Sequence, residues 1–359
     1  MEWPRTMAGV QLVRHGGPET LVWSDAIPVP APAPGEVLLR VLAAGVNNTD
    51  INTRVGWYAK EVTGATDASG TASAEDGGFA GALNFPLIQG GDLCGRVIAL
   101  GAGVETPAVG ARVTCAINQP EPTEDNPVAY RVIGSDYDGC FAEYACVPAR
   151  HLYDVTDAPL SDIEIAAMPC AFGTAAGLLA RAEVGPGDRV LVTGASGGVG
   201  MAAVQLAKVL GAEVTGMASA PKAQAVRDAG AAHVLDRDAA PRPGAYGAVI
   251  DLVGGSGWGA LIDALHPGGR YAVSGAIAGP IVEADLRTIY LNDLSILGST
   301  YQPPEVFGHL VDLMRQGTVR PLISRTYPLE EIHQAQEDFA AKKHPGKLVL
   351  IPPGGSDAE

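Results

Sequence analysis

Three glycines at a spacing of three, Gly194, Gly197 and Gly200, form the most informative pattern in the sequence. An apolar run at 189–193 precedes them, and an alanine-rich amphipathic stretch follows them. A strand that enters a glycine-rich turn and leaves it as a helix places backbone N–H groups and the helix dipole around a phosphate. The spacing is one residue longer than the strict G-x-G-x-x-G, but this position between strand and helix predicts a dinucleotide site. A plain strand-to-helix turn is the alternative.

The residues after the next predicted strand bear on which dinucleotide is bound. A site for NAD usually has an acidic residue about twenty positions after the first glycine, which accepts hydrogen bonds from the ribose hydroxyls. Residues 214–222 contain no acid, and Ser219 and Lys222 stand there instead. A hydroxyl and an ammonium suit a 2′-phosphate, so we expect NADP(H) rather than NAD. The alternative is that Lys222 is only an exposed residue in the first turn of a helix.

The elements that must position this turn form an alternating pattern. From about residue 162 onwards, apolar runs alternate with helical stretches, which is typical of a doubly wound parallel sheet. The first helix is predicted at 163–182, and two later ones at 306–315 and 329–342, before a last strand at 347–351. The six strands of the sheet are predicted at 189–193, 213–217, 233–235, 248–253, 270–274 and 295–299.

The first part of the chain has a different character. Residues 8–50 and 85–155 contain short apolar runs broken by glycine and proline, which predicts a β-rich domain. Residues 59–84 have almost no bulky apolar side chains, and 116–138 are rich in proline. We expect both to be long loops, the first of them on the surface.

Composition limits the class of protein. A chain of 359 residues with 47% hydrophobic and 18% charged residues is typical of a globular protein of two domains. A formal net charge of −16 disfavours nucleic acids and anionic membranes as partners, and no apolar run is long enough to span a membrane. Without a signal pattern or a C-x-x-C pair, we expect a cytoplasmic protein with reduced thiols.

Five motifs occur in the order and spacing of the medium-chain dehydrogenase/reductase superfamily. They lie at 43–50, 85–92, 139–144, 194–200 and 346–350, so the resemblance covers nearly the whole chain. It implies an α/β fold with a GroES-like β-rich catalytic domain plus a Rossmann domain, whose sheet is parallel and doubly wound. The implied catalytic domain comprises 1–170 and 301–359, and the implied NADP(H)-binding Rossmann domain comprises 171–300.

Within this superfamily, the chain resembles the zinc-independent branch of quinone oxidoreductases and enoyl reductases. The zinc alcohol dehydrogenases hold a catalytic metal through Cys, His and Cys, and the matching places here are Asn47, Gly91 and Cys170. An amide and a hydrogen atom cannot replace a thiolate and an imidazole. The four-cysteine structural zinc lobe would fall within 113–139, where only Cys115 occurs. The resemblance therefore implies no metal, and we expect Cys170 to be a small buried side chain.

The branch implies an NADP(H)-dependent oxidoreductase that transfers hydride to an α,β-unsaturated carbonyl or a quinone, with negative charge developing on the carbonyl oxygen. One alternative is an alcohol or carbonyl dehydrogenase of the same superfamily, which would normally need a Lewis acid. Another is a non-catalytic NADPH-binding protein. The expected partners are a small-molecule substrate and further copies of the chain, as a homodimer or homotetramer joined at the edge strand, with neither nucleic acid nor membrane.

Four side chains are candidates for the substrate pocket. Asn47 stands where metal-binding relatives hold their metal, and its amide either polarises a substrate carbonyl or satisfies backbone groups in a turn. Tyr58 matches a pocket tyrosine of the quinone reductases, and either donates a hydrogen bond or a proton or is an ordinary amphipathic tyrosine. Trp57 and Asn52 are expected to line the same pocket. Asp50 is expected to be structural and to cap the helix that starts there.

The cofactor-binding candidates follow the rule that ligands lie outside the carboxyl ends of parallel strands. The resemblance places Thr174 and the run Gly275–Ile277 at the nicotinamide end, and Val253 beside the ribose. Tyr301 and Lys347 are expected to close the cofactor cleft. The full set is Thr174, Gly194, Ser196, Gly197, Gly198, Val199, Gly200, Ser219, Lys222, Val253, Gly254, Gly275, Ala276, Ile277, Tyr301 and Lys347.

Overall fold

The computed structural model describes residues 3–66, 77–79 and 81–356. They fall into two units: unit 1 within Met1–Val62, Ser69–Cys170 and Phe307–Glu359, and unit 2 within Thr63–Ala68 and Ala171–Val306. The predicted catalytic domain includes 63–66 and 301–306, which cluster with unit 2 in the structure. The described part of the chain includes no helix with the length and apolar character needed to cross a membrane.

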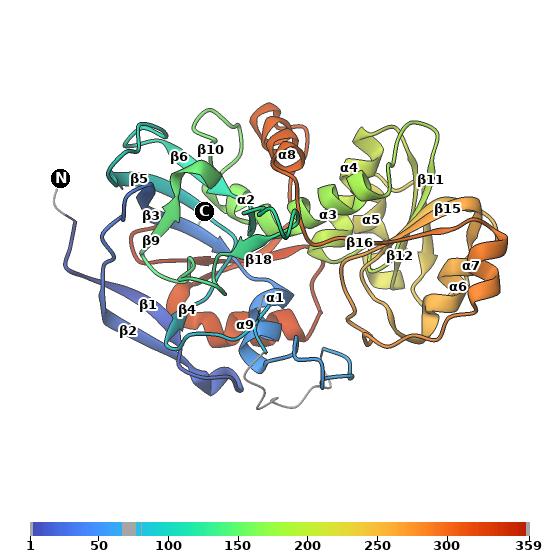
Figure 1. The fold of residues 1–359 in the computed structure, drawn as a ribbon, viewed down its shortest axis with the longest axis horizontal. Helices are drawn as coiled ribbons and strands as arrows, with labels where there is room; N and C mark the ends of the chain where they lie inside the picture. The colour runs from blue at the N-terminus through green and yellow to red at the C-terminus, as the bar shows by residue number, and fades with distance from the viewer. Residues whose placement is uncertain (1–2, 67–76, 80, 357–359) are drawn as a thin grey trace. The chain divides into compact units, whose positions relative to one another are not determined.

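Among the described residues, unit 2 contains a six-stranded sheet whose neighbouring strands are parallel. The strands are β11 (Arg189–Val192), β12 (Glu213–Ala218), β13 (His233–Asp236), β14 (Tyr246–Asp251), β15 (Leu265–Val273) and β16 (Ser295–Gly298). Their order is β13-β12-β11-β14-β15-β16, which is the order of a doubly wound dinucleotide fold. Figure 1 labels β11, β12, β15 and β16 of this sheet. The predicted Rossmann fold is confirmed. All six residues of β14 are buried, as expected for a parallel strand covered on both faces.

Helices connect these strands. α4 and α5 pack against the β11–β13 half of the sheet, and α6 packs against β15. The predicted helix at 163–182 is instead two helices, because Pro169 has no N–H to continue the first one and is suited to begin the second. The bounds are α2 Asp162–Ala166 in unit 1, α3 Pro169–Arg181, α4 Gly198–Val209, α5 Ala223–Asp228, α6 Trp258–Asp263 and α7 Leu286–Leu291.

Unit 1 is β-rich. A seven-stranded sheet has the order β10-β6-β5-β3-β18-β17, with β9 also paired to β3, and a smaller sheet has the order β2-β1-β4 among the described residues. The bounds are β1 Thr6–Leu12, β2 Leu21–Pro28, β3 Glu36–Gly45, β4 Leu87–Ile88, β5 Cys94–Leu100, β6 Arg112–Cys115, β9 Tyr144–Pro148, β10 Leu152–Asp154, β17 Ile323–Pro328 and β18 Lys347–Ile351.

The end of the chain returns to unit 1. β18 pairs antiparallel with β3 through Val349 and Gly45, and this register places Lys347 beside the turn that leaves β3. That turn opens α1 (Asn48–Val55), while α8 (Pro304–Gln316) and α9 (Ile332–Ala340) precede β18. The predicted loop at 116–138 also contains a short hairpin, made of β7 (Asn118–Pro120) and β8 (Tyr130–Val132).

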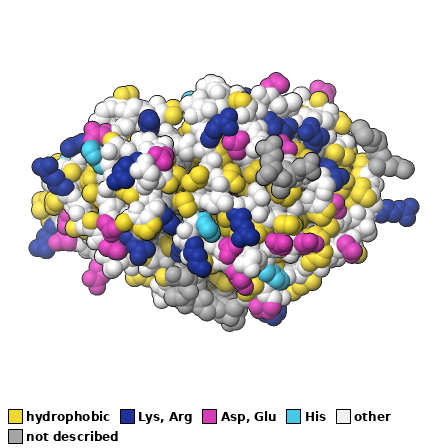
Figure 2. Space-filling model, turned by 180° about the vertical axis from the view of Figure 1, so that it is seen from behind, with side chains coloured by type: hydrophobic (Ala, Val, Ile, Leu, Met, Phe, Trp, Pro, Cys, Tyr) yellow, Lys and Arg dark blue, Asp and Glu magenta, His cyan; other side chains and the backbone are white. Residues whose placement is uncertain are grey.

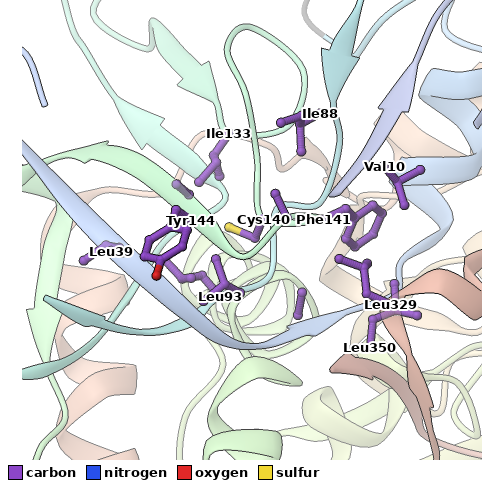
Figure 3. Close-up of a cluster of buried hydrophobic side chains, with 14 of the residues drawn as sticks. Val10, Leu39, Ile88, Leu93, Ile133, Cys140, Phe141, Tyr144, Leu329 and Leu350 are labelled. Atoms are coloured by element: carbon purple, nitrogen blue, oxygen red, sulfur yellow. The ribbon is translucent and has the colours of Figure 1, made fainter. Parts of the chain in front are cut away.

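The core of unit 1 joins segments that are far apart in the sequence. Figure 3 shows Val10, Leu39, Phe141 and Leu350 in one apolar cluster, contributed by the start, middle and end of the chain. Its side chains are almost wholly buried. Because buried side chains pack closely, this cluster holds in place the backbone that carries the polar residues described below. On the face shown in Figure 2, acidic and basic side chains are interspersed rather than separated into large patches.

Candidate active site

Each of the three glycines in the turn between β11 and α4 has a different structural role. Gly194 has a φ of +55°, in the left-handed region that side chains disfavour. A Cβ on Gly200 would overlap the carbonyl oxygen of Gly194 and lie 2.6 Å from Ala195 Cα, so glycine lets the helix approach the strand. A Cβ on Gly197 would meet, among described atoms, the Gly194 oxygen at 3.5 Å, so the outer side of the turn is open to a ligand.

The first turn of α4 faces this opening. Gly197 is the N-cap residue and offers no side chain to cap the helix. The backbone N–H groups of Gly198, Val199 and Gly200 have no intrahelical acceptor by the geometry of an α-helix. They carry the positive end of the helix dipole, which suits the two negative charges of a pyrophosphate. The residues present therefore fit a dinucleotide.

The other predicted cofactor residues of unit 2 lie around the same edge of the sheet. Val253 and Gly254 follow β14, the neighbour of β11, and Gly275 follows β15, the next strand in the order. Ser219 follows β12 and caps the 3-10 turn that ends at Lys222. The half-buried members of the set are Thr174, Gly194, Ser196, Gly198, Val199, Ser219, Lys222, Val253, Gly254, Gly275, Ala276, Ile277 and Tyr301.

In unit 1, three polar side chains form a buried cluster that we call the Asp92 cluster: Asn47, Asp92 and Lys347. Asp92 is fully buried, and its Oδ2 accepts from Lys347 Nζ and Asn47 Nδ2, both at 2.8 Å. Its other oxygen accepts from the Cys170 backbone N–H at 2.6 Å. A Cβ on Gly45 would overlap Asp92 Oδ2, so glycine is needed for this approach. The carboxylate therefore has three charge-assisted partners, which offset much of the cost of burying it.

Lys347, predicted to help close the cofactor cleft, makes its side-chain hydrogen bonds within unit 1. Its side chain is 3% exposed, and its three donors reach Asp92 Oδ2, Asn47 Oδ1 and the Val46 carbonyl. A cofactor contact through this ammonium would have to break one of these bonds. Lys347 therefore orients the Asn47 amide. Its ammonium donates to the amide oxygen, while Asp92 accepts from the amide nitrogen.

Asp50 caps α1, as predicted. Its carboxylate accepts from the Asn47 backbone N–H at 2.8 Å, and its own carbonyl accepts from Gln89 Nε2 at 3.0 Å. The side chain is 4% exposed. Burial raises the pKa of Asp50 to about 7, with a further increase from the nearby Asp92 charge, and the Asn47 bond and the Lys347 charge only partly oppose this.

We expect Asp50 to make unit 1 less stable as the pH rises. Its ordinary pKa is 3.8 and its folded pKa is about 7. Between these values the folded chain holds a proton that the unfolded chain has lost, so the free energy of unfolding falls as the pH rises. Asp50→Asn keeps an acceptor for the Asn47 N–H and removes the titration. Urea unfolding between about pH 5 and about pH 8 should show a falling free energy in the wild type relative to the variant. Parallel curves would contradict this.

Tyr58 lies after α1 and is surrounded by aromatic side chains. Its ring makes edge contacts with Trp57 at 5.4 Å and with Phe79 at 4.9 Å between centroids. Burial raises its pKa above the ordinary value, although hydrogen bonds with Thr49 and Asn52 lower it in part. The hydroxyl therefore stays protonated near neutral pH and is available as a hydrogen-bond donor. Tyr58 thus contacts Trp57 and Asn52, and the role of the three side chains in a substrate pocket stays a prediction.

Two side chains near Asp50 carry buried acceptors that a ligand or a water molecule could satisfy. The side-chain oxygens of Asn52 and Gln89 are buried and have no hydrogen-bond partner among the described residues. Such orphaned acceptors are rare in folded proteins and usually indicate an occupant. Thr49, which also hydrogen bonds with the Cys170 thiol, links this place to α3.

Sequence reasoning missed two of these residues. In the sequence, Asp92 is only the last residue of the 85–92 motif, and Thr49 lies within the 43–50 motif with no role assigned to it. A buried carboxylate leaves little signal in one sequence when its cation lies 255 positions away. The signal for Thr49 was available, because it precedes Asp50 by one residue at the start of the same predicted helix.

Comparison with known proteins agrees with both units. Residues 33–157 match the model of the alcohol dehydrogenase GroES-like domain, and residues 198–316 match that of the zinc-binding dehydrogenases. A crystal structure from Sinorhizobium meliloti 1021, whose name places it among the alcohol dehydrogenases, is 40% identical over 98% of both chains, with a TM-score of 0.86.

Curated relatives carry three kinds of name. An NAD-dependent alcohol dehydrogenase of Sulfurisphaera tokodaii is 28% identical over 96% of this chain and 100% of its own. An acryloyl-coenzyme A reductase of Metallosphaera sedula is 28% identical over 89% and 93%. A quinone oxidoreductase of Rattus norvegicus is 27% identical over 97% and 98%. The chain is an oxidoreductase that belongs to the medium-chain dehydrogenase/reductase superfamily.

Proposed function

We propose that the protein uses NADP(H) to reduce an α,β-unsaturated carbonyl or a quinone without a metal ion. One observation carries this proposal: Asn47, at the place of the first catalytic zinc ligand, is held in a closed cluster with the Asp92 carboxylate and the Lys347 ammonium. Asn47 and Asp92 are bound to each other and to Lys347, so neither is a free donor to a metal. A carbonyl substrate would then be activated by hydrogen bonds alone.

The remaining positions support the same reading. A Cβ on Gly91 would overlap Ile117 Cδ1, so an apolar side chain occupies the space that an imidazole would need. Burial raises the pKa of the Cys170 thiol to about 12, whereas zinc binds the thiolate. The described residues contain no group of three His, Cys, Asp or Glu side chains that could hold a metal ion.

The reduced nicotinamide, when bound, supplies the hydride, and the side chains of unit 1 act on the carbonyl oxygen. We assign the Tyr58 hydroxyl and the second N–H of the Asn47 amide as donors to that oxygen. Lys347 and Asp92 fix the orientation of the amide, and the aromatic contacts of Tyr58 fix its ring. Donors that are held in place before the reaction stabilise the developing charge without reorganisation.

Acceptor screening tests the proposal. Oxidation of NADPH, with NADH in parallel, should be fastest with enones, enoyl thioesters or quinones, and the purified protein should contain much less than one zinc per chain. The second candidate, an alcohol dehydrogenase, is favoured by the name of the 40% identical structure. Stoichiometric zinc with turnover of alcohols or aldehydes would establish it. Tight NADPH binding with no turnover on any acceptor would indicate the non-catalytic alternative.

Tyr58→Phe should lower kcat with the best acceptor by about 10²–10³-fold, the usual effect of removing one donor to a developing oxyanion. The affinity for NADPH should not change, because the substitution removes a hydroxyl from unit 1 only. Tyr144→Phe is the matched control, since this buried tyrosine hydroxyl accepts from Arg40 at 3.0 Å within the same unit. Similar kcat values for Tyr58→Phe and the control would remove Tyr58 from the mechanism.

We further propose that a second copy covers the edge of the unit 2 sheet. β16 ends the strand order, with β15 as its neighbour, and its Ile296 is 43% exposed. In α7, which precedes β16 in the chain, Leu286, Tyr290 and Leu291 are at least 63% exposed. An apolar surface beside an edge strand is a liability in a free monomer. Light scattering on the purified protein should give a multiple of the 36.8 kDa chain mass. A single-chain mass would contradict the proposal.

A further inference from the structure

A carboxylate that the proposed chemistry does not use lies at the centre of the unit 2 sheet. Asp251 ends β14 and is 0% exposed. Its carboxylate accepts from Thr193 Oγ1 at 2.6 Å, the Tyr271 hydroxyl at 2.5 Å and the Val253 N–H at 2.9 Å. The Gly254 N–H donates to it at 3.2 Å. These four partners are neutral, so hydrogen bonds rather than a counter-ion compensate the buried charge.

The donors come from three neighbouring strands. Thr193 follows β11 and directly precedes Gly194 of the phosphate turn, and Tyr271 lies in β15. The Thr193 hydroxyl oxygen also accepts from the Leu252 N–H at 2.9 Å. A single carboxylate therefore joins the ends of the strands on both sides of β14, at the edge where a dinucleotide would lie.

The backbone bonds that start at Asp251 continue into the loops beyond the strands. Val253 accepts from the Ala278 N–H at 2.8 Å, and Gly255 donates to the Gly279 carbonyl at 3.1 Å. Gly254 and Gly255 have φ values of +63° and +70°, so this turn has a backbone shape that few residues adopt. The Ile277 carbonyl in turn accepts from the Thr66 N–H at 3.2 Å.

We propose that Asp251 is a positioning residue that sets the loops at 252–255 and 275–279 for the nicotinamide half of the coenzyme. The inference rests on the proposed function, in that the ligand is taken to be a nicotinamide dinucleotide. We assign the adenosine half to Ser219 and Lys222 after β12, which Asp251 does not contact through any of the bonds above. Loss of Asp251 should therefore weaken binding of the nicotinamide half and leave binding of the adenosine half unchanged.

Asp251→Asn keeps the shape of the side chain but directs an NH₂ group at one or more of the four donors. Affinity for NADPH, measured by calorimetry, should fall about 10- to 100-fold, as expected when charged hydrogen bonds to a buried group are lost. Affinity for 2′,5′-ADP, which contains only the adenosine half, should stay within about two-fold of the wild type. In the ligand-free protein, amide hydrogen exchange should accelerate at Val253 and Gly254.

Two further variants keep the test decisive. Asp236→Asn makes the same change at the exposed end of β13 and should alter none of these readouts. Tyr271→Phe removes one donor without adding another, and it should give a smaller effect of the same pattern if Asp251→Asn does not fold. Equal losses for NADPH and 2′,5′-ADP, or wild-type values for both and for exchange, would overturn the inference. A wild-type protein that binds neither ligand would instead overturn the proposed function.

Discussion

Replacing Lys347 with methionine is expected to lower the free energy of unfolding of unit 1 by about 3–5 kcal/mol, the usual cost of removing one partner from a buried ion pair. Asp92 is fully buried and would lose the one cation that its carboxylate contacts at 2.8 Å. Methionine has nearly the length of the lysine stem, so the loss reports the charge rather than a cavity. The Asn47 amide would also lose the bond that holds its oxygen.

Urea unfolding followed by tryptophan fluorescence measures this effect, since Trp3, Trp23 and Trp57 all belong to unit 1. Arg14→Met is the control: its ion pair with Glu19 is 3.9 Å long and mostly exposed, so its loss should not be measurable. The double variant Lys347→Met with Asp92→Asn should regain part of the loss, because no buried charge is then left without a partner. A single variant as stable as Arg14→Met would refute the assignment.

The same pair shows where sequence reasoning reached its limit. The phosphate turn was predictable because its signal is local: three glycines, a strand before them and a helix after them. The Asp92 cluster was not, because Lys347 meets Asp92 only after β18 has paired with β3. From the sequence, Lys347 was one lysine among several near the end of the chain, and we expected it at the cofactor. Only tertiary pairing reveals that its three donors are used inside unit 1.

The elements of the fold also differ in how well they could be predicted from the sequence. The strands of unit 2 were predicted close to their bounds because buried parallel strands are continuous apolar runs, as in β14. α7 was missed because it has only six residues, too few for its apolar positions to establish a helical repeat. β15 begins at Leu265, five residues before the prediction, and this added part contains Pro267 and two glycines, which are residue types typical of turns. The structure accommodates them in an irregular pairing with β14.

Lys222→Ala should reverse or abolish the preference for NADPH. Lys222 and Ser219 lie half-buried after β12, where an acidic residue would be expected in a site for NAD. A charged hydrogen bond to a phosphate contributes enough that its loss should weaken NADPH binding by about 10- to 100-fold. NADH lacks the 2′-phosphate, so its affinity should hardly change. The difference should shrink as salt rises, because the interaction is partly exposed.

Calorimetric titration of both coenzymes gives the ratio of affinities directly. Lys208→Ala, at the far end of α4 from the phosphate turn, removes the same charge from unit 2 and should leave the ratio unchanged. Ser219→Asp supplies the missing acid, and by repelling the 2′-phosphate and accepting from the ribose hydroxyls it should favour NADH. One outcome is that Lys222→Ala leaves the ratio of NADPH to NADH affinity unchanged while Ser219→Asp shifts it. In that case the coenzyme's ribose does lie at the end of β12, but Lys222 does not bind the 2′-phosphate. If neither variant shifts it, the coenzyme's ribose does not lie at this strand.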